Sequence, residues 1–135
     1  MILDTDVLSA MSARHCPAQL AERLTDARGA IYTTAVNWAE VCYGIARRPT
    51  GEGTRLRERY EELVLPLLDI LHFDEASAEL YANLRVGLER RGERLPDADL
   101  MVASIALRHE MTLVSGNTRH FARIPGLKVE NWLEE

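Results

Sequence analysis

The stretch Met1-Ile2-Leu3-Asp4-Thr5-Asp6 decides the fold. Its three apolar residues in a row, without alternation, predict a short strand that is buried on both faces, as in a parallel sheet. Asp4 ends this strand, and ligand sites of open α/β sheets lie beyond the carboxyl ends of the strands. We therefore expect Asp4 to place a negative charge at a functional edge of the sheet.

The composition is that of one globular domain covering residues 1–135. The apolar fraction of 47% and the charged fraction of 27% are ordinary for such a domain. No apolar run approaches the roughly 20 residues of a membrane span, and no secretory signal opens the chain, so we expect a cytoplasmic protein without a membrane partner. Cys16 and Cys42 lack metal-site spacing and are expected to be reduced thiols, with Cys42 in the core.

The net charge of −5 argues against a surface that coats nucleic acid broadly, but it leaves room for a local basic patch. Lys128 is the only lysine, and all other basic residues apart from histidine are arginines. Arginine binds phosphate and carboxylate groups bidentately. Any phosphate contact of this protein is therefore expected to come from arginine.

Short apolar segments alternate along the chain with helical patterns. Strands are predicted at 1–3, 30–32, 67–71, 112–115 and 127–130, and helices over 7–12, 17–27, 35–46, 54–64, 74–91 and 96–109, with a helical turn at 120–123. This alternation predicts an α/β fold of three layers with a mostly parallel central sheet of four to five short strands.

Three acidic residues stand among apolar neighbours instead of on a charged helix face: Asp4, Glu40 and Asp99. Burying one carboxylate without a partner costs several kcal/mol, and carboxylates that lie close together favour protonation of one of them. If these three converge, something positive must hold them. A divalent cation that prefers oxygen ligands, Mg²⁺ or Mn²⁺, is the expected cofactor.

Helix capping is the alternative role for some of these acids. Asp4 alone can cap the helix that follows it, although we favour Asp6 for that cap. Asp97 is most simply the N-cap of the helix after Pro96, which leaves Asp99 in the first turn, where the helix dipole favours an anion by about 0.3–1 kcal/mol. Glu40 has no basic residue within a helical turn on either side, so capping and ion pairing both fail to explain it.

Other catalytic patterns are missing from the sequence. The four histidines have no paired spacing typical of zinc, and no serine stands between the glycines of a nucleophile elbow. The segment Gly51-Glu52-Gly53 lacks the remainder of a dinucleotide or phosphate-loop pattern. The lone acids are therefore the strongest chemical feature of the chain.

The chain resembles the PIN-domain ribonucleases, and most closely the VapC toxins of bacterial toxin–antitoxin pairs. The resemblance covers nearly the whole chain, and its specificity comes from the order and spacing of its blocks. These blocks are residues 2–8, 34–44, 97–103 and 112–121, followed by 124–127 and 131–133.

This resemblance implies that Asp4, Glu40 and Asp99 are the catalytic, metal-binding residues of a Mg²⁺-dependent endoribonuclease that leaves a 5′-phosphate. It further implies that Thr5, Ser115 and Asn117 bind metal waters or substrate, with Asp6 and Asp97 nearby. The chain departs from the family at two positions. Asp6 stands where Asn is more frequent, and Asn117 stands where many PIN domains have a fourth acid, so we expect one metal ion instead of two.

The resemblance also implies an RNA substrate, a homodimer and a VapB-type antitoxin whose C-terminal segment covers the active site. Because the protein is acidic overall, arginines must supply the phosphate contacts, each adding to the salt dependence of binding. The candidate arginines are Arg14, Arg47, Arg48 and Arg119.

Two other interpretations of the sequence stay open at this point. A phosphatase of the haloacid dehalogenase type also opens with a motif like Asp4-Thr5-Asp6, but it expects a small residue where Val7 stands and a suitably placed lysine. A PIN-like module that binds a partner without cleaving RNA is the second alternative, and the presence of all three lone acids argues against it.

Overall fold

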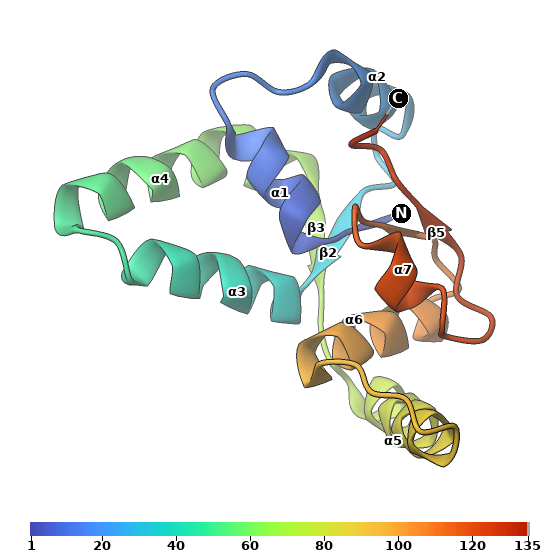
Figure 1. The fold of residues 1–135 in the computed structure, drawn as a ribbon. Helices are drawn as coiled ribbons and strands as arrows, with labels where there is room; N and C mark the ends of the chain where they lie inside the picture. The colour runs from blue at the N-terminus through green and yellow to red at the C-terminus, as the bar shows by residue number, and fades with distance from the viewer. Residues whose placement is uncertain (135) are drawn as a thin grey trace.

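Five short strands, all parallel, form one sheet in the order β3-β2-β1-β4-β5 in the computed structural model, which describes residues 1–134 (Figure 1). The sheet confirms the predicted α/β class and the predicted strand number. The strands are β1 (Ile2–Leu3), β2 (Tyr32–Thr34), β3 (Asp69–Leu71), β4 (Leu113–Val114) and β5 (Val129–Glu130).

Helices connect the strands and cover both faces of the sheet, as Figure 1 shows. Within residues 1–134, no helix combines the length and the apolar character needed to cross a membrane. The helices are α1 (Thr5–Ser12), α2 (Ala18–Asp26), α3 (Ala35–Ala46), α4 (Thr50–Leu63), the 3₁₀ turn η1 (Leu65–Leu67), α5 (Glu75–Arg90), α6 (Asp97–Arg108) and α7 (Thr118–Phe121).

The two central strands divide the core into two layers. Ile2 and Leu113 are paired in register and point into the cluster formed with α5, α6 and α7, while Leu3 and Val114 point into the cluster formed with α1 to α4. All four side chains are completely buried. This follows from the alternation of side chains along a strand, and it explains why both faces of β1 are apolar.

The chain reverses its direction of travel across the sheet between β1 and β4. From β1 it proceeds outward to β2 and β3, and it then returns to the other side of β1 to form β4 and β5. Such a switch point leaves a crevice at the carboxyl ends of the two central strands, where open α/β proteins bind their ligands. Asp4 follows β1 and Ser115 follows β4, so the sequence puts polar groups at this crevice.

Two predicted boundaries are wrong by several residues. The second strand is Tyr32–Thr34 instead of 30–32, because these residues pair with Asp69–Leu71. The helix expected from residue 54 begins at Thr50. Gly53 is buried in this helix at a crowded point: a Cβ there would lie 3.0 Å from the backbone oxygen of Ile45, so glycine permits the close approach.

One further strand, one helical turn and one cysteine also differ from the prediction. The first two residues of the predicted strand 67–71 are the end of η1 and a linking residue, so that β3 starts at Asp69. The helical turn predicted at 120–123 is α7 and lies two residues earlier. Cys16 and Cys42 are free thiols, and Cys42 is half-buried instead of belonging to the core.

Candidate functional site

Asp4 is the central side chain of the candidate site. Its Oδ1 accepts hydrogen bonds from the Thr5 backbone N–H at 2.9 Å and from Asn37 Nδ2 at 2.9 Å, and its Oδ2 accepts from Ser115 Oγ at 2.7 Å. Asp4 is also the N-cap of α1, with an extended backbone. The expectation that Asp6 caps this helix is therefore wrong, because the chain turns into the helix directly after β1. Of about four lone-pair positions on the carboxylate, three are used and one remains open.

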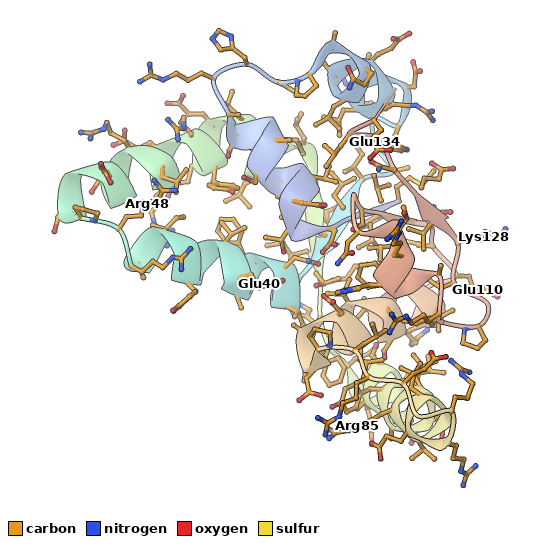
Figure 2. The ribbon with its side chains drawn as sticks, in the orientation of Figure 1. Glu40, Arg48, Arg85, Glu110, Lys128 and Glu134 are labelled. Carbon is orange, nitrogen blue, oxygen red and sulfur yellow. The ribbon has the colours of Figure 1, made fainter. Side chains whose placement is uncertain are left out.

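Thr5 connects Asp4 to the start of α3. Its hydroxyl donates to Glu40 Oε1 at 2.9 Å and accepts from Asn37 Nδ2 at 3.0 Å. Asn37 is completely buried and is oriented by Thr34, whose hydroxyl donates to Asn37 Oδ1 at 2.7 Å and caps α3 by accepting from the Asn37 backbone N–H. The Glu40 side chain itself is exposed, at the edge of the site, on the part of α3 that lies nearest the strands (Figure 2).

Asp99 enters the site from the first turn of α6. Its Oδ2 lies 3.2 Å from His120 Nδ1, and the same ring nitrogen lies 2.8 Å from Asn117 Nδ2. One ring nitrogen cannot donate to Asp99 and accept from Asn117 at the same time, so the tautomer of His120 decides which contact is a hydrogen bond. His120 thus links the segment after β4 to the acid on α6.

Asp6 holds the segment after β4 in place. Its Oδ2 accepts a hydrogen bond from the Gly116 backbone N–H at 2.8 Å. A Cβ on Gly116 would lie 2.7 Å from that same oxygen, so the contact depends on glycine at this position. The neighbouring Asn117 backbone N–H donates to Ser115 Oγ at 2.9 Å, which leaves the Ser115 hydroxyl free to donate to Asp4. Asp6 therefore positions the residues that contact Asp4.

Asp97 takes part in a different set of contacts. The prediction that it caps α6 is wrong: Pro96 occupies the cap position and no side chain caps the helix. Asp97 Oδ1 instead accepts from the Tyr81 hydroxyl at 2.9 Å and lies 3.5 Å from Arg85 Nη1, both on α5. Arg85 is well separated from Glu40 in Figure 2.

A cavity of about 420 Å³ lies beside Asp97 and is lined in part by Arg85, Asp97 and Leu100.

The carboxylates of Asp4, Glu40 and Asp99 influence one another. Partial burial raises the pKa of the Glu40 carboxyl, and the charges of Asp4 and Asp99 raise it further, while the hydrogen bond from Thr5 opposes this change. Burial and the charge of Asp4 likewise raise the pKa of Asp99, against the effect of His120. Burial is also the main cause of the raised pKa of Asp6, to which Asp4 contributes. The site therefore carries an excess of negative charge.

No arginine or lysine side chain among residues 1–134 compensates the negative charge of these three carboxylates. In the described part of the chain, no lysine or arginine forms an ion pair with Asp4, Glu40 or Asp99, and His120 is the one basic side chain within pairing distance of them. Their hard oxygen donors suit Mg²⁺ or Mn²⁺. Across residues 1–134, no three Asp, Glu, His or Cys side chains form a ready-made metal cage.

The predicted phosphate-binding arginines are exposed and lie at different places on the surface. Arg14 follows α1, Arg47 and Arg48 join α3 to α4, and Arg119 lies in α7. Figure 2 shows Arg48 at the connection between α3 and α4. None of the four forms an ion pair with an acidic side chain among residues 1–134.

The site includes residues that the sequence analysis did not single out. Asn37 and Thr34 orient Thr5 and Asp4, and His120 contacts Asp99. One sequence feature could have identified Asn37. It is the only amide in the first two turns of the apolar helix predicted at 35–46, and because it precedes Glu40 by three positions, the two side chains lie on the same helix face. No comparable feature marked His120, because its partner lies 21 positions away in the sequence.

Comparison with known proteins gives one family and a consistent set of relatives. The family model of the PIN domain matches residues 1–127. The chain is 32% identical over 102 residues to a protein named ribonuclease VapC2 from Rickettsia felis, covering 76% of this chain and 74% of that protein. It is 28% identical over 134 residues to the tRNA(fMet)-specific endonuclease VapC from Shigella flexneri, covering 97% and 96%.

A solved structure gives the same result in three dimensions. The fold is similar to that in the crystal structure of VapBC2 from Rickettsia felis bound to a DNA fragment from its promoter. The TM-score is 0.88 at 28% identity, and the match covers 97% of each chain.

Proposed function

The chain belongs to the PIN-domain family, and we propose that it is an endoribonuclease of the VapC type, the toxin of a toxin–antitoxin pair. The family match over residues 1–127 and relatives named as VapC ribonucleases support this proposal. They also favour it over the phosphatase that the motif Asp4-Thr5-Asp6 left open.

The arrangement around Asp4 carries the proposal. Asp4 is held by three hydrogen bonds at the sheet's switch point, and Glu40 and Asp99 approach it from α3 and α6 without an arginine or lysine partner. A protein that needed these acids only for stability would neutralise them, because uncompensated buried charge is costly. The excess of negative charge instead fits a cation that binds for function.

We propose that Asp4, Glu40 and Asp99 hold one Mg²⁺ or Mn²⁺ ion and form the catalytic set. Such an ion, when bound, lowers the pKa of a coordinated water and neutralises charge on a scissile phosphate. The open lone pair of Asp4 supports its part as a ligand. The position after β4 is Asn117, which is close to His120 and brings no fourth carboxylate, so a single ion remains the proposal.

The surrounding residues orient the catalytic set. Thr34 fixes Asn37, which in turn fixes Asp4 and the hydroxyl of Thr5, and Thr5 directs Glu40. Ser115 restrains the second oxygen of Asp4. Glu40 or Asp99, with raised pKa values, is suited to accept a proton from the attacking water.

The substrate and the partners follow from the same proposal. The substrate is RNA, with phosphate contacts from Arg14, Arg47, Arg48 and Arg119, which are free of ion pairs in the described residues. The partner is a VapB-type antitoxin, since the solved relatives include VapBC complexes. We further propose a homodimer in the cytoplasm, where the RNA substrate occurs.

Metal-dependent cleavage by the purified protein tests this function. Structured RNA is incubated with the wild type and with Asp99→Asn, in Mg²⁺, in Mn²⁺ and in EDTA, and the ends of the products are sequenced. We expect cleavage with 5′-phosphate ends only for the wild type with metal. Absence of metal-dependent cleavage, with the variant behaving like the wild type, would show that the protein is a binding module.

Thermal unfolding provides a second measurement that does not depend on finding the right RNA. An ion that binds only the folded protein stabilises it by about 2.7 kcal/mol at a concentration of 100 times its Kd. We expect Mn²⁺ to raise the Tm of the wild type and to have little effect on Asp99→Asn. An equal rise in both proteins contradicts the proposed ligand set.

A further inference from the structure

Tyr43 has the largest exposed fraction among the exposed large apolar side chains of residues 1–134. Its exposed fraction is 67%, whereas Trp38 and Tyr60 pack against the core from α3 and α4. A single exposed apolar side chain is ordinary on a protein surface, so the exposure of Tyr43 gains meaning only from its position and its neighbours.

The position of Tyr43 on α3 places it beside the candidate site. Glu40, Tyr43 and Arg47 are spaced by three and four residues, and this spacing puts them on one face of the helix. With a rise of 1.5 Å per residue, Glu40 and Arg47 are separated by about 10 Å along the helix axis, and Tyr43 lies between them. The ring therefore lies one helical turn from a proposed metal ligand.

The Arg47 guanidinium lies over the Tyr43 ring. Its guanidinium carbon lies 5.5 Å from the centre of the Tyr43 ring, within the range of a cation–π interaction. The helical backbone supports the pairing, because the Arg47 N–H donates to the Tyr43 carbonyl at 3.1 Å. In residues 1–134 neither Arg47 nor Arg48 forms an ion pair, so both retain their charge for an outside anion. In a protein with a net charge of −5, this is a local concentration of positive charge.

We propose that Tyr43 and Arg47 form a stacking platform for one unpaired RNA base, next to the phosphate that is cleaved. The inference rests on the proposed function and adds to it the two side chains that hold the nucleotide beside the cleaved phosphate. Arg47 and Arg48 contact the phosphates that flank the stacked base.

The chemistry of this face favours RNA over a protein partner. Bases of every kind stack on aromatic rings and guanidinium planes, and sequence-specific RNA recognition relies on unpaired bases that are accessible in this way. A base within a duplex is already stacked on both sides and cannot reach Tyr43. A platform one turn from Glu40 therefore selects cleavage sites in loops, without requiring any base-specific hydrogen bond.

Binding measurements on an uncleavable complex test the platform directly. Each Tyr43 variant is combined with Asp99→Asn, and the affinity for a fluorescent single-stranded RNA of about ten nucleotides is measured by anisotropy in Mg²⁺. We expect Tyr43→Ala to weaken binding by about five- to 20-fold, toward the lower part of the range for the loss of one base–aromatic stack, because the ring is exposed. Tyr43→Phe keeps the ring and should bind like the parent.

Two further variants separate stacking from general surface effects. Tyr43→Leu keeps an apolar side chain without a π face and should bind as weakly as Tyr43→Ala. Val86→Ala, on the exposed surface of α5 and in the same Asp99→Asn background, is a matched control that should bind RNA like that background protein. If Leu restores binding, the ring acts only as apolar surface and the platform is wrong.

An abasic scan identifies the stacked nucleotide. RNAs that lack one base at a time are measured with the parent protein and with the protein that carries Tyr43→Ala. At one position, the losses in binding free energy caused by removing the base and by Tyr43→Ala should not be additive, because each change removes the same stacking contact. Additive effects at every position overturn the proposal.

The remaining outcomes distinguish this inference from the proposed function. If Tyr43→Ala leaves RNA affinity unchanged but alters the sedimentation coefficient, Tyr43 belongs to an interface between copies of the chain. If it alters only the affinity for the antitoxin, the face binds protein. Both results overturn the platform while the wild type still cleaves RNA. If the wild type itself neither binds nor cleaves RNA with metal, the proposed function fails instead.

Discussion

Asp97 and Asp99 are two residues apart in the first turn of α6, yet they belong to two different regions of the molecule. Asp97 faces α5, where the Tyr81 hydroxyl and the Arg85 guanidinium compensate its charge. Asp99 faces the end of the sheet, where Asp4 raises its pKa and His120 is the nearest basic group. The same residue type, on the same helix turn, is neutralised in one region and left negative in the other.

This difference distinguishes acids that support the fold from acids that are available to bind a ligand. An exposed carboxylate beside an arginine contributes little to stability and leaves no site for a ligand. A half-buried carboxylate that is repelled by other carboxylates costs stability, and that cost is recovered only when a cation binds. The comparison can be tested by making the same substitution in the two regions.

The largest expected effect is on catalysis. Asp99→Asn should reduce the rate of RNA cleavage by about 1,000-fold or more, since losing a charged metal ligand removes several kcal/mol of transition-state stabilisation. Asp97→Asn should change the rate by less than about twofold, because its exposed pair with Arg85 contributes little to stability and touches no reacting atom. Initial rates under saturating Mn²⁺ measure both. Equal losses in the two variants would remove the distinction between the regions.

A smaller effect is expected from the residue that orients Asp4. Asn37→Ala removes the hydrogen bonds from Nδ2 to Asp4 and to Thr5. Loss of a group that orients a metal ligand typically lowers metal affinity or activity by about 10–100-fold. Isothermal titration with Mn²⁺ measures the affinity, and circular dichroism checks that the variant still folds. Unchanged Mn²⁺ affinity in a folded variant would show that Asn37 supports only the start of α3.

The pH dependence of stability should reflect the raised pKa of Asp99. Asp99 has a raised pKa in the folded protein, so it binds its proton more tightly there than in the unfolded chain. Its contribution to the free energy of unfolding is therefore full below the unfolded pKa and is lost as the pH rises through the folded pKa.

Urea unfolding without metal, from roughly pH 4 to 7, measures this contribution as a difference between proteins. The stability of Asp99→Asn relative to the wild type should increase over this range, because the variant has no charge to place beside Asp4. Asp97→Asn, made on the same helix turn beside Arg85, is the matched control for this measurement. A constant difference between Asp99→Asn and the wild type would contradict the raised pKa.

The smallest effect is expected at the compensated acid itself. Arg85→Gln removes the charged contacts to Asp97 and Glu89, but these pairs are exposed and contribute little to stability. The Tm should fall by a few degrees at most, and cleavage should be unchanged. A large loss of cleavage would mean that Asp97 and Asp99 form one functional unit after all.

Several parts of the fold could be predicted from local pattern. The apolar run before Asp4 predicted β1, and the apolar sequence after Asp99 lies in the predicted helix that the structure shows as α6. These features depend on neighbours in sequence. The predicted boundaries were wrong where contacts between distant residues determine them. The strand β2 lies two residues later than predicted because it pairs with β3, and α4 begins four residues earlier because Gly53 packs against the end of α3.

The candidate site shows the same division. The lone acids Asp4, Glu40 and Asp99 were chosen because acids are rare among apolar neighbours. The capping roles expected of Asp6 and Asp97 were wrong, because capping depends on where the backbone turns. Both acids instead contact partners outside their own helix, Gly116 and Arg85. His120 was missed for the same reason.

The sequence by itself determined the layered α/β fold, the edge of the sheet where Asp4 stands, and the set of acids that lack a nearby positive charge. Periodicity and local charge report these properties because they are set by residues within a few positions of one another. Only the tertiary structure decided which acid is compensated, since ion pairs, hydrogen bonds and repulsion form between residues that are distant along the chain. The contrast between Asp97 and Asp99 arises entirely from what α5 and the strand ends place beside them.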